Sequence, residues 1–94
     1  MATVLSDELL QQIATTWGTP VYVYHAEKIK EQYERLLKAF AKADVRFFYA
    51  AKALTNISVL KYVKSIGCNI DCSSINEVQL AVKAGYAPEN ILYT

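Results

Sequence analysis

Hydrophobic residues recur along this chain at two different spacings, and the spacing changes near residue 45. Before that point they lie three or four positions apart in two segments, which predicts two amphipathic helices. The first helix is expected to begin after Ser6, a residue type common at the N-cap, and to end at Gly18. Residues 21–24 form a short β-type run between the two helices. The apolar positions are Leu9, Leu10, Ile13 and Trp17 in the first helix and Ile29, Tyr33, Leu36, Leu37 and Phe40 in the second.

From residue 45 onward, strand-like and helix-like segments alternate. Gly67 and Gly85 follow the two helix-like segments, at positions where glycine commonly ends a helix. Because a parallel strand needs a crossover long enough for a helix, this alternation predicts parallel strands joined by right-handed crossovers. The expected elements are, in order, a strand at 45–51, a helix at 55–66, a strand at 68–72, a helix at 74–84 and the start of a third strand at 91–94.

The strand expected at 45–51 is apolar along most of its length, as strands are when helices cover the sheet. The pattern therefore predicts an α/β fold. A closed (β/α)8 TIM barrel takes about 250 residues, so the 94 residues of this chain are expected to form only the N-terminal part of one. We expect residues 1–24 to form an N-terminal helix and extended segment, and residues 25–94 to form the first βα units of an incomplete barrel domain.

Composition and charge exclude several classes of partner. The net charge of +1, with lysine and glutamate interspersed, gives no basic footprint for nucleic acid or an anionic membrane. No apolar run approaches the roughly 18 residues of a membrane span, and the N-terminus has no secretory signal, so we expect a cytoplasmic protein. Cys68 and Cys72 would lie about 13 Å apart on one strand, too far for a disulfide. With one histidine in the chain, no metal site is expected.

Lys52 raises a chemical question because it follows the apolar run at 45–51 directly. Burying an unpaired ammonium group costs several kcal/mol, so this lysine either reaches water or has chemistry to do. Functional groups gather where parallel strands end, and Asp71 stands at that end of the next strand. Adjacent strands lie about 4.8 Å apart, close enough for Lys52 and Asp71 to pair directly.

Simpler interpretations of the same residues exist. Pattern alone favours Lys52 as a solvated strand end and Asp71 as a loop cap. Glu77 has the spacing of a capping box, Ser74-Ile-Asn-Glu77, in which Ser74 would bond the Glu77 amide and Glu77 would reach back to the Ser74 amide. Spacing alone therefore favours a cap over a catalytic role for Glu77.

Three stretches of the chain resemble a known family. They read TPVYVYHAEKI, VRFFYAAKALTN and GCNIDCSSINEVQLAVKAGYAPENILYT, and they are similar to the opening of the ornithine, arginine and diaminopimelate decarboxylases that use pyridoxal 5'-phosphate. The resemblance is most specific at FYAAKA. It implies that Lys52 carries the cofactor covalently, that Ala50 lines the pocket of its ring, and that Asp71 and Glu77 lie near the lysine.

The same resemblance implies an enzyme that releases CO2 from an amino acid. Within the family the chain is most similar to the members that convert meso-diaminopimelate to L-lysine, and a homodimer with a shared active site is also implied. A lysine is required because a primary amine can bond to the cofactor aldehyde, whereas a permanently protonated arginine cannot. The alternatives are arginine, ornithine or carboxynorspermidine as substrate, or a non-catalytic relative that binds a protein partner. The phosphate-binding and ring-stacking residues are expected beyond Thr94.

Overall fold

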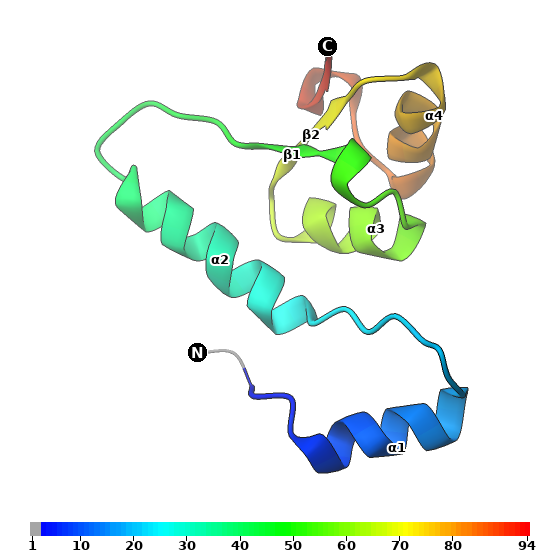
Figure 1. The fold of residues 1–94 in the computed structure, drawn as a ribbon. Helices are drawn as coiled ribbons and strands as arrows, with labels where there is room; N and C mark the ends of the chain where they lie inside the picture. The colour runs from blue at the N-terminus through cyan, green and yellow to red at the C-terminus, as the bar shows by residue number, and fades with distance from the viewer. Residues whose placement is uncertain (1–2) are drawn as a thin grey trace.

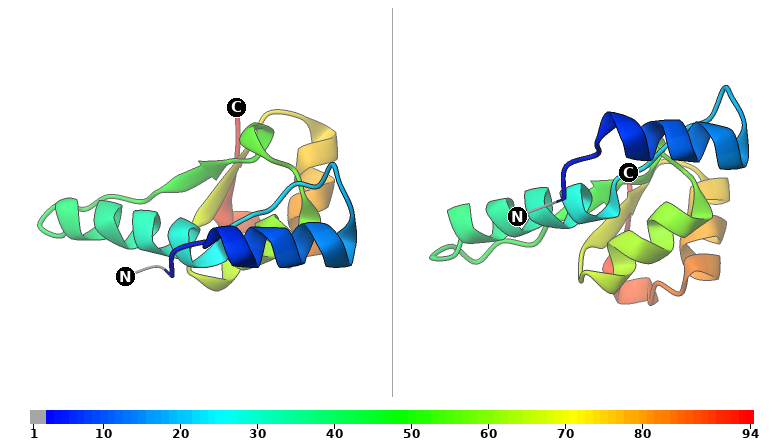
Figure 2. Two further views of the ribbon diagram at one scale, coloured as in Figure 1. Left: turned by 60° about the horizontal axis from the view of Figure 1, so that its bottom comes forward. Right: turned by 90° about the horizontal axis from the view of Figure 1, so that it is seen from below.

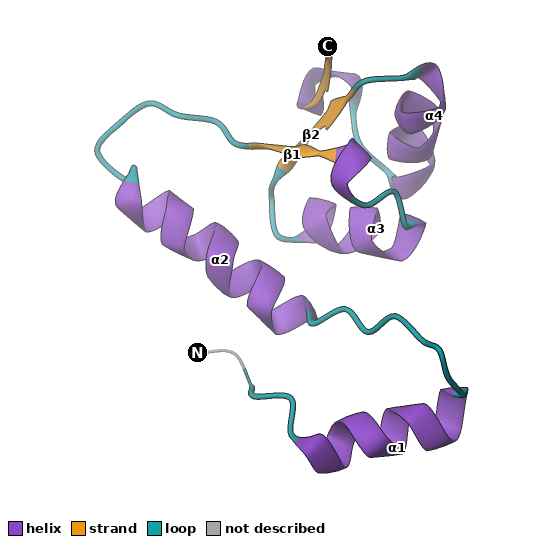
Figure 3. Ribbon diagram, in the orientation of Figure 1, coloured by secondary structure: helices purple, strands orange, loops and turns teal. Residues whose placement is uncertain are grey.

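The computed structural model describes residues 3–94 and consists of two N-terminal helices followed by alternating strands and helices (Figure 1). Of the segment predicted at 1–24, residues 1 and 2 lie outside the described part. Figure 3 shows the elements coloured by type. They are α1 (Asp7–Trp17), α2 (Ala26–Ala39), β1 (Phe48–Ala50), the 3-10 helix Ala51–Ala53, α3 (Ile57–Ser65), β2 (Asn69–Cys72), α4 (Ile75–Ala84), the 3-10 helix Pro88–Asn90 and β3 (Ile91–Tyr93).

The three strands form one parallel sheet in the order β1-β2-β3. Helices α3 and α4 contact each other and pack on the same face of this sheet (Figure 2). Each helix connects two neighbouring parallel strands, as the alternation in the sequence requires. The predicted α/β class and the parallel pairing of the strands are therefore confirmed.

The core lies between the sheet and these two helices. Leu60 of α3 and Ile70 and Cys72 of β2 are fully buried, and burial of each large apolar side chain stabilises the fold by about 1.5–3 kcal/mol. Along β2 the residues alternate, because Asn69 and Asp71 are only half-buried and lie on the opposite face. That opposite face of the sheet carries the polar positions that matter for the candidate site.

The N-terminal helices are much less buried than the βα part of the chain. No residue of α1 or α2 is buried, and Trp17 is 76% exposed. The radius of gyration is 15.3 Å, whereas a compact chain of this length has about 12 Å. Both helices form as predicted, but their apolar faces are largely uncovered within residues 3–94. None of the helices described here is long and apolar enough to cross a membrane.

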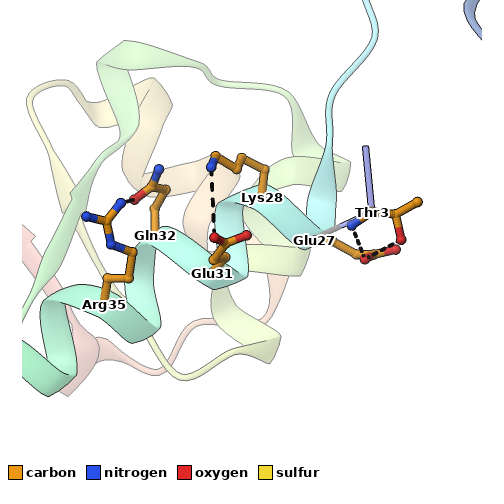
Figure 4. A network of polar contacts seen from close by, with 6 residues as sticks. All are labelled: Thr3, Glu27, Lys28, Glu31, Gln32 and Arg35. Atoms are coloured by element: carbon orange, nitrogen blue, oxygen red, sulfur yellow. Dashed lines mark hydrogen bonds and ion pairs between the residues drawn. The ribbon is translucent and has the colours of Figure 1, made fainter. Parts of the chain in front are cut away.

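Polar contacts connect the residues before α1 to α2 (Figure 4). The Thr3 amide and hydroxyl both donate to the Glu27 carboxylate, at 3.0 and 2.9 Å. These two hydrogen bonds hold the pKa of Glu27 below its ordinary value. Further along α2, Lys28 pairs with Glu31 at 3.9 Å. These contacts are open to solvent on at least one side, so each contributes little to stability.

Three of the sequence predictions differ from the structure. Residues 21–24 are not a strand, because they are exposed and pair with none of the three strands of the sheet. The first strand spans Phe48–Ala50 rather than 45–51, since Val45 is 42% exposed and the chain turns into a 3-10 helix after Ala50. The helix predicted at 55–66 begins at Ile57, because the Asn56 side chain accepts hydrogen bonds from the Ser58 and Val59 amides.

Both cysteines are expected to resist alkylation in the folded protein. Cys68 and Cys72 are free thiols with 8% and 0% exposure, and burial raises the pKa of both. A raised pKa lowers the fraction of reactive thiolate at neutral pH. Treatment with iodoacetamide at neutral pH should leave both residues unmodified by mass spectrometry, while the same treatment in urea should modify both. Rapid native labelling of Cys72 would contradict the packing of β2.

Candidate active site

Lys52 lies one residue further from the sheet than its sequence pattern predicts. Strand β1 ends at Ala50, Ala51 is fully buried, and Lys52 is the exposed central residue of the 3-10 helix Ala51–Ala53. The ammonium group therefore reaches water and carries no large desolvation cost. We call the side of the sheet where the parallel strands end the carboxyl edge, and the Lys52 turn lies there directly after β1.

Asp71 lies at the same edge on the neighbouring strand. The register places Ala50 opposite Asp71, and both residues are half-buried on the face away from α3 and α4. The Asp71 carboxylate accepts a hydrogen bond from the Thr94 hydroxyl at 2.7 Å. Within residues 3–94 it forms no ion pair with Lys52, so the direct pairing that the strand spacing would allow does not form, and Lys52 is the solvated strand end that the pattern favours.

Thr94 is a residue of this edge that the sequence pattern did not single out. Its amide donates to the Cys72 carbonyl at 3.0 Å, which extends the pairing of β3 beyond Tyr93. Its hydroxyl then reaches Asp71 across the sheet. The signal in the sequence was its position at the end of the third strand, equivalent to that of Asp71 at the end of the second.

Glu77 caps the N-terminus of α4, as its spacing predicts, but with one change of partner. The Ser74 side chain accepts from the Glu77 amide at 3.2 Å. The Glu77 carboxylate accepts from the Ser73 amide at 2.9 Å rather than from the Ser74 amide. The Ser73 hydroxyl is also 3.3 Å from both carboxylate oxygens. The cap thus holds the Glu77 carboxylate at the carboxyl edge, in the loop that follows Asp71.

Glu77→Gln is expected to keep the stability of the protein, because the glutamine amide oxygen can still accept from the Ser73 amide. Glu77→Ala should cost about 0.5–2 kcal/mol of stability, since it removes the acceptor. Thermal melting and kcat of the full-length protein check both variants. The catalytic role that the family resemblance implies for Glu77 predicts that Glu77→Gln lowers kcat severalfold at an unchanged melting temperature, because the variant loses the negative charge. An unchanged kcat in this variant would limit Glu77 to capping.

The carboxyl edge therefore brings together one exposed primary amine and two carboxylates, each carboxylate already held by a hydroxyl or amide donor. Among residues 3–94, no three His, Cys, Asp or Glu side chains gather as a metal cluster. A parallel βα protein with a lysine on a tight turn at this edge belongs to the class whose active sites lie where the strands end. An exposed primary amine at this edge is a group suited to chemistry on carbonyl compounds.

Comparison with known proteins identifies the family within this class. Residues 26–94 match the model of the family described as pyridoxal-dependent decarboxylase, pyridoxal binding domain. The chain belongs to this family. It is 42% identical over 85 residues to the diaminopimelate decarboxylase of Methanothermobacter thermautotrophicus. The matched region covers 88% of this chain and 20% of that protein.

Solved structures agree with this assignment. The crystal structure of AQ1208 from Aquifex aeolicus superposes with a TM-score of 0.83 at 43% identity, over 89% of this chain and 21% of the other. The chain also superposes on the I148L mutant of diaminopimelate decarboxylase from Helicobacter pylori, crystallised in complex with L-lysine, with a TM-score of 0.81 at 34% identity. This match covers 89% of this chain and 21% of the other. The chain thus spans about one fifth of the length of these relatives.

Proposed function

We propose that this chain is the N-terminal part of a TIM-barrel decarboxylase that uses pyridoxal 5'-phosphate to convert meso-diaminopimelate to L-lysine and CO2. The observation that carries the proposal is the exposed Lys52 on its turn at the carboxyl edge, within the segment that matches the family. The names of the relatives support the substrate, and so does the L-lysine bound to the Helicobacter pylori enzyme.

The residues at the carboxyl edge fit the cofactor. Pyridoxal phosphate is an aldehyde, and a primary amine free of ion pairs with other described residues is the group that bonds to it. Lys52 would hold the cofactor covalently, and the small side chain of Ala50 leaves room for the ring at the end of β1. Asp71 and Glu77 would lie beside it. The bound cofactor supplies an electron sink for the carbanion formed when CO2 leaves.

The protein side chains have distinct roles in this proposal. The neutral Lys52 amine is the nucleophile, so a permanent salt bridge would hinder it. Asp71 accepts from Thr94 and Glu77 accepts from Ser73, and the Lys52 amine has no fixed carboxylate partner among residues 3–94. Whenever Lys52 is not bonded to the cofactor, these two carboxylates would stabilise its ammonium group and keep it near the site.

The whole protein is proposed to be a cytoplasmic homodimer with an active site shared between subunits. Arginine, ornithine and carboxynorspermidine remain the alternative substrates, because the roles proposed for Lys52, Asp71 and Glu77 would be the same for each of them. A non-catalytic relative is disfavoured by an exposed lysine at the position where the family motif has its cofactor lysine.

The test is CO2 release by the full-length protein from meso-diaminopimelate, ornithine, arginine and carboxynorspermidine in parallel. We expect turnover with meso-diaminopimelate, formation of L-lysine, and loss of activity after borohydride reduction. Turnover with one of the other three compounds, and not with meso-diaminopimelate, would correct the proposed substrate but still support a decarboxylase that uses pyridoxal 5'-phosphate. No turnover and no covalent cofactor would refute the proposed function.

A further inference from the structure

The turn that carries Lys52 is fixed at both of its ends. At its start, the Ala51 side chain is fully buried in the core. At its end, the Tyr49 hydroxyl donates a hydrogen bond to the Leu54 carbonyl at 3.1 Å. The Leu54 amide donates in turn to the Ala51 carbonyl at 3.2 Å. Lys52 is therefore an exposed residue between two anchored points.

Tyr49 is well placed to hold this turn. It is half-buried, and it packs against two groups of buried residues, one around Leu60 and one around Val59. Burial raises the pKa of the Tyr49 phenol, and Tyr24 adds to the shift. The hydroxyl thus stays protonated at neutral pH and remains a hydrogen-bond donor to Leu54.

We propose that Tyr49 is a positioning residue for Lys52: its hydroxyl, bonded to the Leu54 carbonyl, closes the Lys52 turn and sets where the amine stands at the carboxyl edge. This inference rests on the proposed function, in which the Lys52 amine attacks an aldehyde. Such attack depends on close alignment of the reacting atoms, and a displacement of about 1 Å can slow a reaction about 100-fold.

Tyr49→Phe in the full-length enzyme tests the role, because it removes the hydroxyl and keeps the ring that packs in the core. Tyr86→Phe is the matched control. The Tyr86 hydroxyl also donates to a backbone carbonyl, that of Cys68, at 3.0 Å, but at the opposite end of the sheet from Lys52. Each variant therefore loses one tyrosine hydrogen bond to the backbone, and only one of them loses it at the Lys52 turn.

The decisive measurement is the rate at which added pyridoxal phosphate attaches to the cofactor-free enzyme. Attachment is trapped with borohydride and quantified on the Lys52 peptide by mass spectrometry, and melting temperatures are recorded for each variant. We expect similar losses of melting temperature in both variants, and attachment slowed about tenfold or more only in Tyr49→Phe.

Equal attachment rates in Tyr49→Phe and Tyr86→Phe would overturn the proposal. A Tyr49→Phe protein that fails to fold would also overturn it, because the hydroxyl would then serve folding rather than positioning. Failure of the proposed function gives a different result, namely that the parent enzyme shows no attachment at Lys52 at all.

Discussion

Lys52→Arg in the full-length protein is expected to abolish covalent attachment of pyridoxal phosphate and to lower kcat by about 10³-fold or more. Arginine keeps the positive charge, and Lys52 is exposed on a short turn, so the fold should tolerate the larger guanidinium group. The guanidinium group stays protonated and therefore cannot bond to an aldehyde. Lys52→Ala should lose the same activity. Borohydride trapping and CO2 release measure the two effects.

The matched control is Lys61→Arg, which changes an exposed lysine on α3 away from the strand end. It should leave cofactor attachment, kcat and melting temperature near the values of the parent. If Lys52→Arg instead decarboxylated at a rate close to that of the parent, Lys52 would act only through its charge. The proposed chemistry at the carboxyl edge would then be wrong.

Asp71→Asn is expected to lower kcat by about 10- to 100-fold while the cofactor still attaches. Asparagine keeps the shape of the side chain and can still accept from the Thr94 hydroxyl, so β2 and β3 should remain paired. It loses the negative charge that stabilises the displaced Lys52 ammonium group in our proposal. The loss should therefore appear in kcat more than in cofactor binding or melting temperature.

Thr94→Val separates the charge of Asp71 from its placement. Valine removes the hydroxyl that donates to Asp71 at 2.7 Å and has nearly the same shape as threonine. We expect Thr94→Val to lower kcat less than Asp71→Asn does, because the charge of Asp71 is retained. Thr94→Ser keeps a hydroxyl and should therefore have a kcat close to that of the parent. An Asp71→Asn enzyme with the kcat of the parent would show that this carboxylate has no part in turnover.

The elements from α3 to β3 could be predicted from the sequence because their signals are local. Strand β2 and helix α4 follow from the apolar spacing, from the capping pattern at Ser74 and Glu77, and from Gly85, which ends α4 with a positive φ of 102°. The alternation of strands and helices then predicts parallel pairing, and parallel pairing brings the residues after β1 and the end of β2 to one edge. In this way the position of Lys52 near Asp71 could be inferred.

Contacts between distant residues could not be predicted in the same way. The apolar run at 45–51 looks like one strand, but only Phe48–Ala50 finds a partner in β2, and the chain then forms the turn that exposes Lys52. The partner of Asp71 is also decided by register, because Thr94 lies 23 residues away and reaches Asp71 only once β3 pairs with β2.

By itself, then, the sequence determined the α/β class, the order of the elements and a lysine suited to covalent chemistry, since these depend on residue types and their spacing. Only the tertiary structure decided that Lys52 is solvated rather than paired with Asp71, and that the Tyr49 hydroxyl holds its turn. The physical reason is that a polar group takes whichever partner the packed backbone brings within about 3 Å, and spacing along the chain does not specify that partner.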